Sequence, residues 1–123
     1  MPQVEIRIIA NFERNLEAID RYFHEAGIPD AFGNLLDELN DTVMPNLEHF
    51  PGMGRLFLDR AVGSMEAANR EDVLRKKLRI VSGELFEYIM TDYLVLYLRQ
   101  DGVIHLLSIK HHRQLSFDFA GRW

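Results

Sequence analysis

The chain has 123 residues, of which 47% are hydrophobic and 27% are charged, a composition that excludes a disordered chain and predicts one globular domain over residues 1–123. It has no cysteine, which excludes disulfides and thiolate chemistry, and no apolar run long enough to cross a membrane. The net charge of −5 argues against a protein that coats nucleic acid, although the charge is uneven: residues 1–72 carry 14 acidic and 6 basic side chains, whereas residues 73–123 carry 5 and 8.

The N-terminal segment MPQVEIRIIANFERN has no basic start followed by a long apolar stretch, so we expect no secretory signal and a cytoplasmic location. Residues 4–10 alternate in polarity, which predicts a strand with one face fully buried. Asn11 is a suitable cap for the helix that follows, and Gly27 and Pro29 end that helix. The apolar stripe of this helix consists of Phe12, Leu16, Ile19, Phe23 and Ala26.

A second helix follows after a gap of a few residues. Asp30 is suited to cap it, and Pro45 should kink or end it near Val43, because the proline ring opposes the carbonyl group four residues earlier. Its apolar stripe consists of Phe32, Leu35, Leu36, Leu39, Val43 and Leu47. Two amphipathic helices joined by so short a connection predict an antiparallel helical hairpin.

The middle of the chain has a weaker pattern. Residues 49–57, HFPGMGRLF, form a predicted turn, and residues 58–82 are predicted to be a partly helical insertion in which Ser64 caps a short helix. This helix carries Met65, Ala68, Val73 and Leu74, and the basic run after it consists of Arg75, Lys76, Lys77 and Arg79. Charge runs of this kind are typical of a solvated helix face.

The period changes to two after Gly83. Residues 84–90, 93–99 and 103–110 are three predicted strands, separated by Thr91-Asp92 and by Gln100-Asp101-Gly102. Turns of this length and composition predict tight hairpins. The order strand, helix, helix, strand, strand, strand predicts an α+β fold of two layers, with the helical hairpin packed on an antiparallel sheet and the first strand paired at an edge of the three-stranded meander.

Lys110, His111, His112 and Arg113 follow the last strand in a row. The two histidines point to opposite faces of an extended segment, and no third ligand is evident, so the sequence predicts neither a metal nor a cofactor. Antiparallel pairing should place this segment near Asp92 and Tyr93, with Arg99 at the opposite rim.

Three motifs, together with the order of elements, resemble the RelE/ParE superfamily of toxins from bacterial type II toxin–antitoxin modules. FPGMGR at 50–55 is similar to the turn that closes the helical hairpin in these proteins, and YIMTDYLVLYLRQDGVIHLLSIKH at 88–111 is similar to their C-terminal meander. HHRQ at 111–114 is similar to the His-x-Arg that follows their last strand. The resemblance covers nearly all of the chain except residues 58–82.

The resemblance implies a toxin that is neutralised by a cognate antitoxin, with which it forms a hetero-oligomer. The favoured reading is a ParE-like toxin that inhibits DNA gyrase. One alternative is a RelE-like, metal-independent endoribonuclease that cleaves mRNA on the ribosome, and another is a non-catalytic domain for protein association. The aromatic tail without a tyrosine and the few basic residues on the strands depart from the nuclease pattern.

Under the nuclease reading, His111 or His112 acts as the acid or base, because histidine is suited to proton transfer near neutral pH. Arg113, Arg99 and Arg79 then bind phosphate. Under the binding reading, the residues expected to contact the target or the antitoxin are Lys110, Tyr93, Phe117, Phe119 and Trp123.

Overall fold

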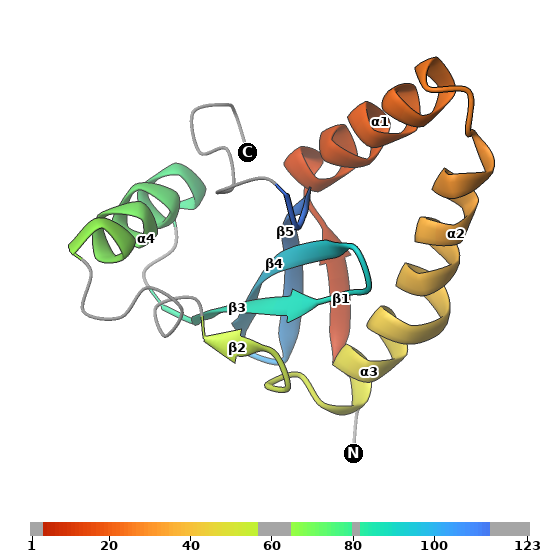
Figure 1. Cartoon of the computed structure of the whole chain (residues 1–123). Coiled ribbons are helices and arrows are strands. Elements are labelled where there is room, and N and C mark those ends of the chain that lie inside the picture. The colour runs from red at the N-terminus through yellow and green to blue at the C-terminus, as the bar shows by residue number, and fades with distance from the viewer. Residues whose placement is uncertain (1–3, 57–64, 80–81, 114–123) are drawn as a thin grey trace.

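The computed structural model describes residues 4–56, 65–79 and 82–113 (Figure 1). Its elements in chain order are β1 (Glu5–Ile8), α1 (Ala10–Glu25), α2 (Asp30–Glu38), the π-helical segment η1 (Leu39–Val43), α3 (Met44–His49), β2 (Arg55–Leu56), α4 (Met65–Leu78), β3 (Glu84–Ile89), β4 (Tyr93–Gln100) and β5 (Val103–His111). The α+β architecture predicted from the sequence is confirmed. The structure adds a short strand, β2, in the segment predicted to be only a turn.

The sheet has the strand order β1-β5-β4-β3-β2. The three C-terminal strands form the predicted meander, and β2 also pairs antiparallel with β3, but β1 pairs parallel with β5. The sheet is therefore mixed, and the prediction of an antiparallel sheet is wrong at this one edge. Because β1 has a neighbour on one side only, it is less buried than its alternating sequence suggested, and Ile8 is exposed.

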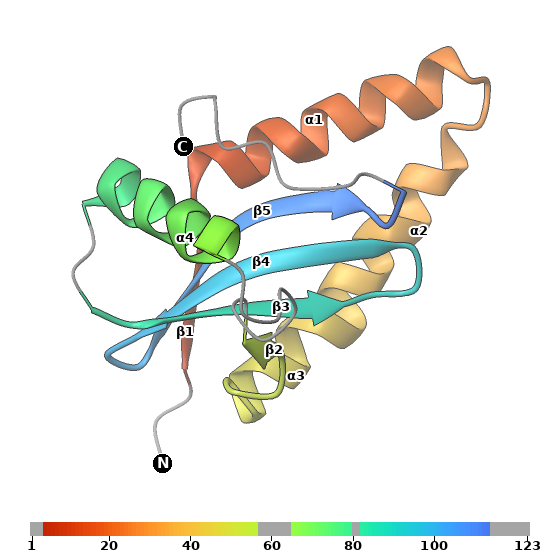
Figure 2. The same ribbon diagram turned by 60° about the vertical axis from the view of Figure 1, so that its left-hand side comes forward.

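Both faces of the sheet are covered. Along β4 the side chains alternate, so that Tyr93, Val95 and Tyr97 join the core cluster formed with α1–α3, whereas Leu94, Leu96 and Leu98 join a second cluster. Figure 2 shows α4 on the side of the sheet away from α2 and α3. The second cluster includes Leu74 of α4, which is fully buried.

The sequence predicted a helix inside the 58–82 insertion, and α4 confirms it. It did not predict that this helix would add a layer to the expected two. The exposed side chains of Lys76, Lys77 and Arg79 agree with a solvated basic face.

The helix boundaries differ from the predicted caps. The position before α1 is occupied by Ile9, and the Asn11 side chain is buried instead of capping the helix. Asp30 is the first residue of α2, so Pro29 and not Asp30 occupies the cap position. The predicted end of α1 is confirmed, since Gly27 directly follows the cap residue with a φ of 76°, which glycine adopts without strain.

Pro45 does not end the second helix. The chain passes through η1, in which the Met44 N–H bonds the carbonyl of Leu39, and continues as α3 with Pro45 near its start. A π-helical turn widens the backbone by one residue, which makes room for a proline that lacks an N–H group and opposes the carbonyl of Asp41. The expected disturbance near Val43 is thus a local widening and not a break.

Beyond the end of β1, the side chains of two asparagines of α1 form hydrogen bonds with the edge of β5 in place of a strand. The β1 pairing stops at Leu106, and the Asn11 side-chain amide then donates to the carbonyl of Leu107 at 3.0 Å. One turn later, the Asn15 side-chain oxygen accepts the backbone N–H of Ile109 at 3.0 Å and the Ser108 hydroxyl at 2.8 Å. These bonds fix α1 against β5, because buried backbone groups need partners.

We therefore expect Asn15→Leu to lower the free energy of unfolding by about 2 kcal/mol, because it leaves the Ile109 N–H and the Ser108 hydroxyl without their acceptor. Urea denaturation followed by circular dichroism measures the change. The matched control is Asn34→Leu on the exposed face of α2, which should change stability by no more than about 0.5 kcal/mol. Equal losses in the two variants would show that Asn15 does not hold the edge.

Candidate functional site

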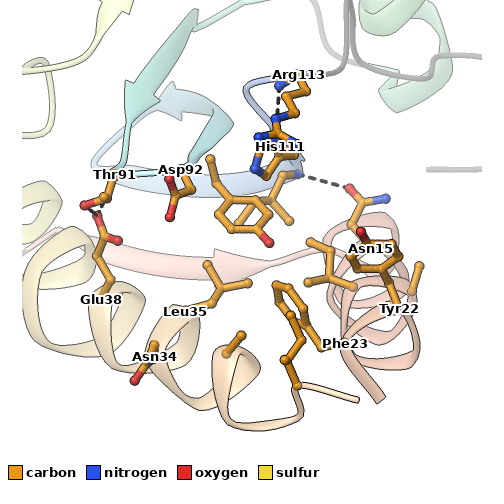
Figure 3. Close-up of a pocket in the computed structure, with 16 residues that line it drawn as sticks. Asn15, Tyr22, Phe23, Asn34, Leu35, Glu38, Thr91, Asp92, His111 and Arg113 are labelled. Carbon is orange, nitrogen blue, oxygen red and sulfur yellow. Dashed lines mark hydrogen bonds between the residues drawn. The ribbon is translucent and has the colours of Figure 1, made fainter. Parts of the chain in front are cut away.

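A pocket of about 810 Å³ lies between α1, α2 and the end of the sheet where β4 begins and β5 ends (Figure 3). The two helices meet at the Gly27 turn and diverge from there, so the predicted hairpin is open (Figure 1). Its open side faces this end of the sheet. The pocket is thus formed by the geometry of the connection between α1 and α2.

The floor and walls of the pocket are apolar. Leu35, Tyr93 and Ile109 are buried and line it from α2, β4 and β5. Two large apolar side chains that line the pocket are exposed to solvent: Tyr22 is 65% exposed and Ile28 is 53% exposed. An apolar cavity bordered by exposed apolar side chains is typical of a protein-binding groove.

The polar end of the pocket is formed by the turn between β3 and β4. The Glu38 carboxylate of α2 accepts the Thr91 backbone N–H at 2.9 Å and the Thr91 hydroxyl at 3.2 Å (Figure 3). On the other side, the backbone N–H of His112 donates to the carbonyl of Asp92, and a ring nitrogen of His112 lies 3.1 Å from the carbonyl of Met90. The turn is therefore held from both sides, and the carboxylates of Glu38 and Asp92 both line the pocket.

His111 and Tyr93 lie opposite each other on β5 and β4. Their rings pack edge to face, with centroids 5.3 Å apart. Nδ1 of His111 accepts the backbone N–H of Arg113 at 3.0 Å, so the proton of the neutral ring resides on Nε2. Burial, and then the charge of Asp92, raises the pKa of Tyr93, so its hydroxyl stays protonated at neutral pH.

The structure brings together only part of the predicted site. Tyr93, His111 and Arg113 all line the pocket, and His112 anchors the adjoining turn. Lys110 is buried on the opposite face of the sheet, because it pairs with Leu94 and successive residues of a strand alternate between faces. The basic run predicted as one rim is therefore divided between two faces.

The remaining predicted residues lie elsewhere. Arg99 pairs with Ile104 at the other end of β4, as the sequence predicted, and Arg79 is exposed just after α4 with a φ of 55°. Phe117, Phe119 and Trp123 lie outside the described residues. Of the three arginines expected to bind phosphate, Arg113 lies beside His111 in the pocket, whereas Arg99 lies at the other end of β4.

Neither a metal centre nor a membrane-spanning helix is found in residues 4–56, 65–79 and 82–113. No three histidine, aspartate or glutamate side chains there are grouped as metal ligands. None of the helices in these ranges is both long and apolar enough to cross a membrane.

The sequence reasoning missed the helical side of the pocket. Tyr22 and Ile28 fall outside the predicted apolar stripes, and Glu38 was not among the candidate site residues. Large apolar residues away from the core stripe were a usable signal, because a helix of one isolated domain has no need of them. Nothing in the sequence indicated that the two helices would diverge.

A family model described as "ParE toxin of type II toxin-antitoxin system, parDE" matches residues 6–116, well over half of the chain. No curated protein matches the sequence.

Proposed function

Because this chain belongs to the family of ParE toxins of type II toxin–antitoxin systems, we propose that it inhibits growth in the cytoplasm by acting on DNA gyrase and that a cognate antitoxin neutralises it. The family implies an antitoxin partner. We propose DNA gyrase as the target and direct binding of the antitoxin as the mode of neutralisation.

The observation that carries the proposal for the antitoxin is the pocket between α1 and α2. Its apolar floor is bordered by the exposed side chains of Tyr22 and Ile28 and by the carboxylates of Glu38 and Asp92. This surface suits a segment that folds on binding and presents apolar side chains to the floor and basic side chains to the carboxylates. We propose that the antitoxin supplies such a segment.

The placement of the cations supports inhibition by binding over cleavage of RNA. Metal-independent cleavage needs a proton-transfer group and several cations around one phosphate. Of the arginines expected to bind phosphate, Arg113 lines the pocket beside His111, whereas Arg99 lies at the far end of β4. A single nearby arginine falls short of the several cations that cleavage needs. Blocking an enzyme requires only a complementary surface.

Two assays with the purified protein test the target. We expect the protein to inhibit supercoiling of relaxed plasmid DNA by gyrase at a micromolar or lower concentration, and to leave mRNA intact when it is added to translating ribosomes. Premixing it with the cognate antitoxin, which we expect to be the product of a neighbouring reading frame, should restore supercoiling. A preparation purified in the same way from cells that do not express the protein is the control for inhibition by contaminants.

Each alternative predicts a different result. Cleaved mRNA with unaffected gyrase would support the RelE-like endoribonuclease. Normal growth of cells that express the protein without its antitoxin would support a non-catalytic association domain. Either outcome overturns the proposed target.

A further inference from the structure

The turn of residues 50–56, FPGMGRL, displays large apolar side chains to solvent. Phe50 is 65% exposed, Met53 is 48% exposed and Leu56 is 39% exposed. In the part of the chain that the structure describes, eight large apolar side chains are exposed, and three of them lie in this one seven-residue turn. Single exposed apolar residues are ordinary, but such a concentration marks an interaction surface.

The 50–56 turn is rigid although it is exposed. The Tyr97 hydroxyl of β4 accepts the Gly54 N–H at 3.0 Å and donates to the carbonyl of Pro51 at 3.1 Å. The Met53 N–H closes the turn onto the carbonyl of Phe50 at 3.0 Å. A surface held in one conformation before binding loses little entropy when a partner binds.

Cationic groups border the apolar side chains. The Arg99 guanidinium reaches the turn, because its Nη1 lies 3.0 Å from the position that a Cβ on Gly52 would occupy. Arg99 is exposed and makes no ion pair with any residue that the structure describes, although Glu84 lies across from it on β3. Arg55 is also exposed, and it pairs with the buried carboxylate of Glu87 at 3.6 Å. Of these two cations, Arg99 is therefore the more available to a partner.

We propose that the 50–56 turn is the surface through which this toxin contacts its protein target, and that the target presents an apolar pocket bordered by carboxylates. This inference rests on the proposed function, since it assigns a surface to the inhibited enzyme. The partner that binds this turn is a protein and not a nucleic acid, because three apolar side chains dominate the surface. Binding of a phosphate backbone would require a larger set of cations.

The 50–56 turn and the pocket occupy different ends of β4. Tyr93, the first residue of the strand, lines the pocket, whereas Tyr97 and Arg99 support the turn. The turn also lies at the outer edge of the sheet, since β2 is the terminal strand. Changes at the turn should therefore affect the target without affecting an antitoxin bound in the pocket.

The test uses the full chain with two changes at the turn, the double variant Phe50→Ser/Met53→Ser and the single variant Arg99→Gln. Each should raise the concentration needed for half-inhibition of gyrase supercoiling about tenfold or more, as loss of an interface hot spot does. Each should bind the product of the neighbouring reading frame within about threefold of the wild-type affinity, which also shows that it is folded. Val73→Ser and Lys76→Gln on α4 are the matched controls, and both should inhibit as the wild type does.

The possible outcomes test the role of the 50–56 turn separately from the identity of the target. If the wild type inhibits gyrase and both turn variants inhibit it equally well, the inference is wrong. Loss of antitoxin binding in these variants, with inhibition intact, would assign the turn to the antitoxin instead. If the wild type leaves gyrase active, the proposed target is wrong, and growth arrest then replaces supercoiling as the readout. The turn variants should still relieve that arrest, and their failure to do so overturns the inference.

Discussion

Gly54→Ala should lower the free energy of unfolding by about 3 kcal/mol, a large part of the stability of a domain of this size. A Cβ at this position would lie 2.6 Å from the Tyr97 hydroxyl oxygen and 2.8 Å from the Glu87 carbonyl oxygen. The carbonyl belongs to the central backbone of β3 and cannot move aside. The turn must therefore lift off the sheet, which also breaks the bonds of Gly54 and Pro51 to Tyr97.

The neighbouring glycine provides the matched control. A Cβ on Gly52 would meet only the Arg99 Nη1, at 3.0 Å, and this is the far end of a flexible side chain. Gly52→Ala should therefore cost less than about 1 kcal/mol. Urea denaturation of both variants gives the comparison, and similar losses for Gly52→Ala and Gly54→Ala would contradict the role assigned to the close contact.

Tyr22→Ala and Ile28→Ser should each weaken binding of the antitoxin about 30-fold, which is the loss typical of a hot spot worth about 2 kcal/mol. Both side chains are exposed at the rim of the pocket, so their removal takes apolar area from the interface without opening the core. Titration calorimetry with the product of the neighbouring reading frame measures the affinity. In cells, co-expression of that product should no longer restore growth.

Val73→Ser on α4 serves as the control, because Val73 is an exposed apolar side chain that does not line the pocket. Its helix lies on the side of the sheet away from α2 (Figure 2). Its affinity for the antitoxin should equal that of the wild type. Melting temperatures of all three variants confirm that the fold is intact. Wild-type affinity in Tyr22→Ala and Ile28→Ser would place the antitoxin on another surface.

The strands and helices were largely readable from the sequence because their patterns are local. The meander from residue 84 onward was predicted closely, since Asp101 and Gly102 adopt the left-handed conformation that their residue types favour in a tight hairpin. The helix stripes were correct for a similar reason, except at Ala26, which is exposed: Phe12 and Leu47 are fully buried where the helical period placed them.

The placement of the candidate site residues was only partly predictable from the sequence, because a continuous run of basic residues conceals which face of the sheet each residue occupies. The prediction that residues 110–113 lie near Tyr93 followed from antiparallel pairing and is confirmed, since Tyr93 pairs with His111. The separation of Lys110 from His111 also follows from the strand period, but the continuous basic run concealed it. Asn11 was misread because its amide fits two roles, and the buried carbonyl of Leu107 decided between them.

The sequence by itself determined the α+β class, the hairpin turns, the core stripes and the resemblance to a toxin family, because each depends on residues that are near one another in the chain. Only the tertiary structure decided the parallel pairing of β1, the divergence of α1 from α2 and the placement of α4 on the second face of the sheet. These features depend on packing between distant segments. The glycines of FPGMGRL show the difference: the sequence indicated a turn, but only the approach of Tyr97 and Glu87 from two other strands explains why Gly54 leaves no room for a side chain.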